Sequence, residues 1–290
     1  MDIIEIIKAI IVGVVEGITE WLPVSSTGHI ILTDAFLPLN VSESFKEMFD
    51  VVIQLGAIFA VILLFWNKLW PLTRYRESTG VVAIGKMCAV KKSSVRLWIK
   101  VIIACIPSIL IGLPFDDWLD EHLYNPTVVS IMLIVYGVAF IIVEQFNKKR
   151  EPRIVTGQNL TYRMAFFIGC FQALAIIPGT SRSGATILGA ILLGCSRTIA
   201  AEFSFYLAVP TMFGASILKV VKFLLEGGRF TGTEIVILAA ATITAFIVSV
   251  AAIKFLLGFV KKRSFASFGY YRIALGALVL ILLYSGVIAA

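Results

Sequence analysis

Residues 126–143 carry no charged side chain, and their sequence is PTVVSIMLIVYGVAFIIV. About 20 apolar residues in a helix span the hydrocarbon core of a bilayer, where every backbone polar group must be paired. The whole chain follows this pattern, because it is 59% hydrophobic and 15% charged, whereas soluble domains average about 25% charged residues. The sequence therefore predicts an all-α polytopic membrane protein. Six segments are expected to span the membrane, at about residues 49–66, 97–113, 126–143, 203–222, 235–257 and 270–288.

Two further apolar regions, residues 3–38 and 160–195, are interrupted by Pro, Gly and Ser. In each region the second apolar arm has about a dozen residues, too few to cross a core of about 30 Å. Irregular backbone at membrane depth is tolerated only where protein buries it or where it lines a polar cavity. We therefore expect two re-entrant helix–loop–helix hairpins.

The two interrupted regions resemble each other. EGITEWLPVSSTGHIIL begins at residue 16 and QALAIIPGTSRSGATIL begins at residue 172, and three expected spans follow each region. Because three is odd, the second half must enter the membrane upside down relative to the first. The sequence thus predicts an inverted-topology repeat of residues 1–150 and 151–290, with a site near the midplane between the broken helices.

The loop charges predict the orientation. Positive side chains concentrate in the loops that cells retain in the cytoplasm. This rule places both termini outside, so that the first hairpin enters from outside and the second from inside. The N-terminus has no small-residue cleavage site and is not expected to be a cleavable signal peptide. Nothing resembles a nucleic-acid-binding motif. The acidic residues Asp116, Asp117, Asp120 and Glu121 lie in a loop expected outside the cell. The basic residues on which the predicted orientation depends are Lys68, Arg74, Arg76, Lys86, Lys91, Lys92 and Arg96, then Lys148, Lys149, Arg150 and Arg153, then Lys261, Lys262 and Arg263.

The first hairpin contains two acids, Glu16 and Glu20, which lie four residues apart and so share one helical face. In a soluble protein they would be solvated acids at a helix end, but intramembrane acids usually have a function. We expect them to hold Mg²⁺ or Ca²⁺, or one of them to orient a histidine.

The break after Pro23 contains hydroxyls and a histidine. Ser25, Ser26 and Thr27 suit a helix N-terminus, where free N–H groups favour a phosphate. Ser25 is expected to cap the helix, whereas Ser26 lies three residues before His29 and so shares its face. We expect Ser26 to be a nucleophile and His29 to transfer its protons, rather than to be a packing histidine.

The second break has the sequence PGTSRSGAT, and Arg182 stands in it beside hydroxyls. A snorkelling arginine would lie near a membrane surface, whereas a guanidinium at the break can clamp phosphate oxygens. Two glycines suit a tight backbone close to a ligand. The expected phosphate-binding residues are Arg182, Ser181, Ser183, Thr186, Gly179 and Gly184.

EGITEWLPVSSTGH and PGTSRSGAT resemble the two signatures of the undecaprenyl-diphosphate phosphatases, the bacitracin-resistance family. The resemblance covers the whole chain, with one small departure, because many relatives carry glutamine where this chain has Glu16. It implies hydrolysis of undecaprenyl diphosphate, which recycles the lipid carrier of bacterial cell-wall synthesis. It also implies a site that opens to the outer face of the cytoplasmic membrane, and a divalent cation. The sequence leaves the oligomeric state open, a homodimer included.

Two other readings compete. Phosphatases of the type-2 phosphatidic acid class pair an SGH element with a serine–arginine motif and a second histidine, but Leu188 stands where that histidine would fall. A polyprenyl-phosphate or anion transporter would share the inverted repeat and the broken helices. Such a transporter has no need of Ser26 beside His29 and two acids. A combined phosphatase and flippase stays open, and so does direct attack by water in place of Ser26.

Overall fold

The computed structural model describes residues 3–74, 81–83 and 88–288, and it is predominantly helical. In this described part, six helices are long and apolar enough to cross a membrane. The predicted spans are therefore confirmed, although most of the helices are longer than the sequence indicated. They are α3–α4 (Glu43–Leu64), the first part of α6 (Lys92–Gly112), α7 (Pro126–Asn147), α10 (Arg197–Leu225), α11 (Gly232–Val260) and α12 (Ala266–Tyr284).

The first of these spans is not one regular helix. Helix α3 (Glu43–Val52) and helix α4 (Gln54–Leu64) meet at Ile53, and the amide of Gly56 bonds the Ile53 carbonyl at 3.1 Å. Ser42 caps α3, because its hydroxyl accepts from the Phe45 amide at 3.3 Å. The sequence pattern gave no indication of this join.

Two pairs of shorter helices correspond to the interrupted regions. Helices α1 (Ile3–Thr19) and α2 (Ser26–Phe36) flank the first break. Helix α8 (Tyr162–Ala173), the 3₁₀ turn η1 (Leu174–Ile176) and helix α9 (Arg182–Leu192) surround the second. Both regions therefore form a helix, a break and a second helix of 11 residues.

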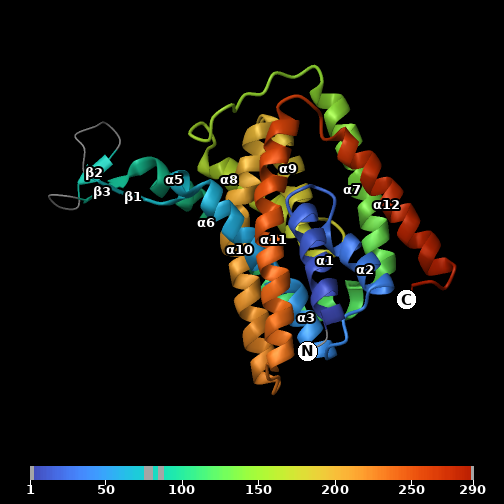
Figure 1. Ribbon diagram of the computed structural model, residues 1–290. Coiled ribbons are helices and arrows are strands. Elements are labelled where there is room, and N and C mark those ends of the chain that lie inside the picture. The colour runs from blue at the N-terminus through green and yellow to red at the C-terminus, as the bar shows by residue number, and fades with distance from the viewer. Residues whose placement is uncertain (1–2, 75–80, 84–87, 289–290) are drawn as a thin grey trace.

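A small antiparallel sheet was not anticipated. Strands β1 (Leu72–Arg74), β2 (Val81–Ala83) and β3 (Cys88–Lys91) pair in the order β1-β3-β2, with Leu72 opposite Val90 and Val82 opposite the same residue. The sheet follows the short helix α5 (Trp66–Leu69) and extends to one side of the helical bundle (Figure 1). Two of the basic residues used for the orientation, Arg76 and Lys86, lie outside the described residues.

Figure 1 shows the links that follow α7 and α11 at one end of the bundle, and both chain termini away from that end. These two links carry Lys148, Lys149 and Arg150, and Lys261, Lys262 and Arg263. We refer to this end as the basic end. The side chains of the predicted acidic group at 116–121 are outside the described ones.

Small residues allow the helices to approach closely. A Cβ added to Gly17 of α1 would lie 2.8 Å from the Ala245 carbonyl oxygen of α11, and one added to Gly137 of α7 would lie 2.7 Å from the Gly269 carbonyl oxygen of α12. Where no hydrophobic effect drives association, helices in lipid associate through such close van der Waals packing. These contacts fix α1 on α11 and α12 on α7, and so set the positions of both helix breaks.

Candidate active site

The two helix breaks meet inside the bundle. Arg182 Nη2 donates to Glu20 Oε1 at 3.0 Å, and the Ser183 hydroxyl donates to the Glu20 backbone carbonyl at 3.1 Å. Glu20 follows α1 and Arg182 begins α9, so residues 162 positions apart in sequence are paired. The predicted meeting of the two polar breaks is therefore observed.

Both second helices begin after a serine with an unusual backbone. Ser25 has φ 71° and Ser181 has φ 70°, and no other non-glycine residue has a positive φ in the part of the chain that the structure describes. Such conformations cost on the order of 1–3 kcal/mol and persist where surrounding contacts enforce them. Helices α2 and α9 therefore both begin after a residue with a strained backbone. The first N–H groups of a helix favour an anion.

The two serines differ in what their side chains do. The Ser181 hydroxyl caps α9 by accepting from the Gly184 amide at 3.2 Å. The expected cap by Ser25 is not formed, because its buried hydroxyl has no hydrogen-bond partner among the described residues. Its hydroxyl therefore stays available to a ligand.

Glu20 connects the serine to the arginine. The Ser26 hydroxyl donates to Glu20 Oε2 at 3.0 Å, while Glu20 Oε1 accepts from Arg182. Arg182 also donates through Nη1 to the Ser204 carbonyl at 2.9 Å, and its guanidinium lies over the ring of Trp21 at 5.8 Å. A carboxylate that accepts the hydrogen bond of a buried hydroxyl can take the hydroxyl proton during a nucleophilic attack.

In the described structure the ring of His29 does not contact Ser26 through a hydrogen bond, although the sequence predicted that the two would act together. Its Nδ1 lies 2.7 Å from the Ser25 carbonyl and its Nε2 lies 2.7 Å from the Tyr271 hydroxyl. Because a carbonyl only accepts, Nδ1 carries a proton, and in the neutral ring Nε2 accepts from Tyr271. His29 is thus oriented by Ser25 and Tyr271, not by an acid.

Glu16 is fully buried one turn before Glu20, and neither of its carboxylate oxygens has a hydrogen-bond partner among the described residues. Buried polar groups are normally paired, so each exception needs an explanation. Two neighbouring carboxylates, with oxygens of a bound diphosphate, are the hard ligands that Mg²⁺ or Ca²⁺ prefers. The residues fit a cation shared with a substrate. The described residues contain no group of three acids, histidines or cysteines that would hold a metal alone.

The other predicted residues lie at the second break, except Thr27, which lies at the first. The Thr186 hydroxyl donates to the Arg182 carbonyl at 2.9 Å and lies 2.6 Å from the Ser204 hydroxyl. Gly179 has φ 85°, and a Cβ there would collide with the Val129 carbonyl of α7. Its tight backbone therefore serves packing against α7. Gly184 donates its amide to Ser181, and Thr27 is half-buried beside Ser26.

Arg272 of α12 is a residue of the site that was not predicted from the sequence. It is fully buried, and it donates to the carbonyls of Gly179 at 2.8 Å, Thr180 at 3.0 Å and Pro23 at 3.3 Å. It also reaches the carbonyls of Met132 and Leu133, both at 3.4 Å. One guanidinium thus binds the backbones of both breaks. An arginine inside an expected span was the sequence feature that marked it.

The fold and the site define a multi-pass helical membrane protein with buried charged and hydroxyl groups where two broken helices meet. The chain belongs to the bacitracin resistance protein BacA family, whose model matches residues 9–278. It is similar to undecaprenyl-diphosphatases of Acetivibrio thermocellus (57% identical, over 96% of this chain and 97% of the relative), Enterococcus faecalis (54%, over 97% and 98%) and Lactiplantibacillus plantarum (53%, over 96% and 97%).

Proposed function

We propose that this protein is an undecaprenyl-diphosphate phosphatase, which hydrolyses undecaprenyl diphosphate to undecaprenyl phosphate and inorganic phosphate. The observation that carries the proposal is the Ser26–Glu20–Arg182 arrangement, in which a carboxylate bonds a hydroxyl on one side and a guanidinium on the other. It combines a nucleophile, a base and a phosphate clamp within one buried site. The family membership and the near-complete coverage of relatives named undecaprenyl-diphosphatase support the same activity. This activity returns the lipid carrier to cell-wall synthesis and confers resistance to bacitracin.

In the first step the Ser26 oxygen attacks the terminal phosphorus and its proton passes to Glu20. The bond from that phosphorus to the bridging oxygen breaks, and the lipid monophosphate leaves with the bond electrons. The guanidinium of Arg182 and the N-termini of α2 and α9 stabilise the charge on the transferring phosphoryl group. Arg182 can do this because Ser204 and Trp21 hold its side chain at the break.

In the second step water attacks the phosphoserine, the bond from phosphorus to the Ser26 oxygen breaks, and that oxygen regains the proton that Glu20 took in the first step. His29 lies on the same helix one turn after Ser26, and its Nε2 can exchange a proton once it leaves Tyr271. We assign to the imidazolium form of His29 the protonation of the leaving group, after which the neutral ring takes a proton from this water. Ser25 and Tyr271 orient the ring for this role.

A divalent cation, Mg²⁺ or Ca²⁺, would be held by Glu16 and Glu20 together with diphosphate oxygens. When bound, it would neutralise charge on the diphosphate and relieve the repulsion between the substrate and the two acids. Glu16 is the stronger candidate, because both of its oxygens lack protein partners among the described residues, whereas Glu20 already bonds Ser26 and Arg182.

The two helix–break–helix segments are re-entrant hairpins of an inverted repeat, with residues 1–150 and 151–290 as its halves. The supporting observation is the match of Ser25 with Ser181. These two strained serines are related by the same offset in sequence as Glu16 and Gln172, and as Gly28 and Gly184. With the basic end in the cytoplasm, the site opens to the outer face of the bacterial cytoplasmic membrane. The same architecture suits a polyprenyl-phosphate transporter, which is the alternative function.

We predict that the purified protein in detergent, where no compartments exist for transport, releases phosphate from undecaprenyl diphosphate. Ser26→Ala should lower kcat by at least about 1,000-fold with substrate binding retained, because it removes the nucleophile. His29→Ala should lower kcat by about 100-fold. Ser285→Ala, which removes an exposed hydroxyl from the C-terminal end of α12, serves as the control. If Ser26→Ala keeps a substantial fraction of kcat while His29→Ala does not, water attacks directly. If wild type releases no phosphate in detergent, the transporter is favoured.

The cation is tested by treating the same preparation with excess chelator. We expect turnover to fall by at least about tenfold and to recover when Mg²⁺ or Ca²⁺ is restored, because charge neutralisation by a cation contributes on the order of a few kcal/mol. Glu16→Gln should weaken the response to added cation. Full turnover in excess chelator would instead leave Glu16 and Glu20 with a proton-transfer and orienting role.

The orientation is tested by placing single cysteines in a cysteine-free background and labelling intact cells with an impermeant thiol reagent. Lys262→Cys at the basic end should be protected, because that end faces the cytoplasm. Arg229→Cys, in the link between α10 and α11, and Ser285→Cys, after α12, should be labelled from outside. Protection of Ser285→Cys together with labelling of Lys262→Cys would reverse the proposed orientation.

A further inference from the structure

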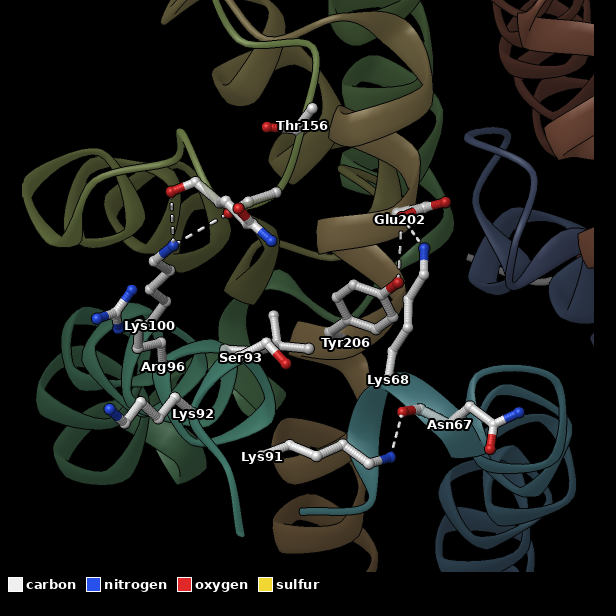
Figure 2. Close-up of a pocket in the computed structure, with 13 residues that line it drawn as sticks. Asn67, Lys68, Lys91, Lys92, Ser93, Arg96, Lys100, Thr156, Glu202 and Tyr206 are labelled. Carbon is white, nitrogen blue, oxygen red and sulfur yellow. Dashed lines mark hydrogen bonds and ion pairs between the residues drawn. The ribbon is translucent and has the colours of Figure 1, made fainter. Parts of the chain in front are cut away.

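A second polar region lies near the basic end, away from the helix breaks. Here a cavity of about 840 Å³ is lined by residues of α5, β3, α6, α10 and the link before α8 (Figure 2). Five of its lining side chains are cationic and only one is anionic. The cations are Lys68, Lys91, Lys92, Arg96 and Lys100, and the acid is Glu202.

The cationic charge of this cavity is poorly compensated within the protein. Lys68 is paired with Glu202 at 2.8 Å, and Tyr206 donates to the same carboxylate at 3.1 Å. Among the described residues, the Lys91 ammonium donates only to the Asn67 carbonyl, at 2.9 Å. Lys92 and Arg96 have no carboxylate partner among the described residues, and Figure 2 draws no interaction from either.

Lys100 is the clearest case of a cation without an opposite charge in this cavity. It is 7% exposed, and its ammonium donates to the carbonyls of Gly157 at 3.0 Å and Gln158 at 3.4 Å, with no carboxylate among the described residues. Burying a cation without an opposite charge is costly. Lys92, Arg96 and Lys100 also follow one another at intervals of four on α6, so that like charges adjoin on one face of the helix. This arrangement favours occupation by an anion.

The start of α6 adds a second feature that favours an anion. The helix begins at Lys92 and no side chain caps it. Its first N–H groups and the positive end of its dipole therefore lie beside Lys91 and Lys92 at the cavity. The start of this helix of 32 residues, the buried ammonium of Lys100 and the other cations thus all belong to the lining of one cavity.

Two tryptophans flank the lining residues Asn67 and Lys68 in the sequence. Trp66 and Trp70, on either side of Asn67 and Lys68, are stacked with ring centroids 4.6 Å apart and are 46% and 43% exposed. Tryptophan is enriched at the level of lipid headgroups. An exposed aromatic pair of the kind found at lipid headgroups therefore neighbours two of the lining residues.

We propose that this cavity is a binding site for a phosphorylated group, a lipid phosphate headgroup or free phosphate, separate from the site at the helix breaks. The positive-inside rule alone explains basic loops, but it does not require charges from several elements to line one cavity or an ammonium to be buried in it. The proposal is independent of the activity assigned above.

The test uses the full chain in phosphatidylcholine nanodiscs and the double variant Lys92→Gln/Arg96→Gln. One arm counts phosphatidylglycerol molecules retained on the protein by native mass spectrometry, and the other titrates inorganic phosphate by calorimetry. The control, Lys261→Gln/Lys262→Gln, removes the same charge from exposed positions at the basic end outside the cavity. Both variants keep Arg182, so phosphate bound at the helix breaks is common to both titrations.

We expect the cavity variant to weaken binding of at least one probe by about tenfold or more, because charge-assisted hydrogen bonds are lost, and the control to change it by less than about twofold. Loss of phosphatidylglycerol alone identifies a lipid headgroup, and loss of phosphate alone identifies the free anion. Equal weakening in both variants, or no change with either probe, would overturn the proposal. Arg96→Gln alone, at an exposed side chain, replaces the double variant if the latter does not fold.

Discussion

The contact between Glu20 and Arg182 is the interaction on which the rest of the site depends. It joins two parts of the chain that are 162 residues apart, and both side chains are largely buried. Removing one partner of a buried ion pair leaves an uncompensated charge, which costs about 3–5 kcal/mol. The same pair lets two helices end inside an apolar bundle, because each break supplies polar partners that the other lacks. Ser183 adds to this exchange by donating to the Glu20 carbonyl.

Arg272 joins the backbones of the two breaks, as Glu20 and Arg182 join their side chains. Its guanidinium is bonded to carbonyls of both breaks and has no acid partner among the described residues. The polar site is thus built in two layers. Arg272 holds the main chain at Pro23, Gly179 and Thr180, and the side chains of Glu20, Ser26 and Arg182 then face one another. Helix α10 supports the arrangement through Ser204, which bonds both Arg182 and Thr186.

The sequence predicted the parts of this structure that follow from composition and local pattern. Uncharged runs such as 126–143 indicated the spans, and polar residues in apolar surroundings indicated Glu20, Ser26 and Arg182. What could not be predicted depends on three-dimensional contacts. The direction of the His29 ring is decided by Tyr271, which lies 242 residues away. The sequence also does not show that Ser181 caps its helix whereas Ser25, with nearly the same φ, does not. The three-stranded sheet lacks long alternating strands, and the join at Ile53 lies in a continuous apolar run, so neither had a clear pattern.

The most direct test of this account is a double-mutant cycle on the stability of the protein in detergent. Unfolding free energies are measured for wild type, Glu20→Gln, Arg182→Gln and the double variant. Each single variant should lose about 3 kcal/mol, because a buried charge is left without its partner. The double variant should lose less than the sum, by at least about 1 kcal/mol. Losses that add to within about 0.5 kcal/mol would contradict the claim that this ion pair joins the two halves.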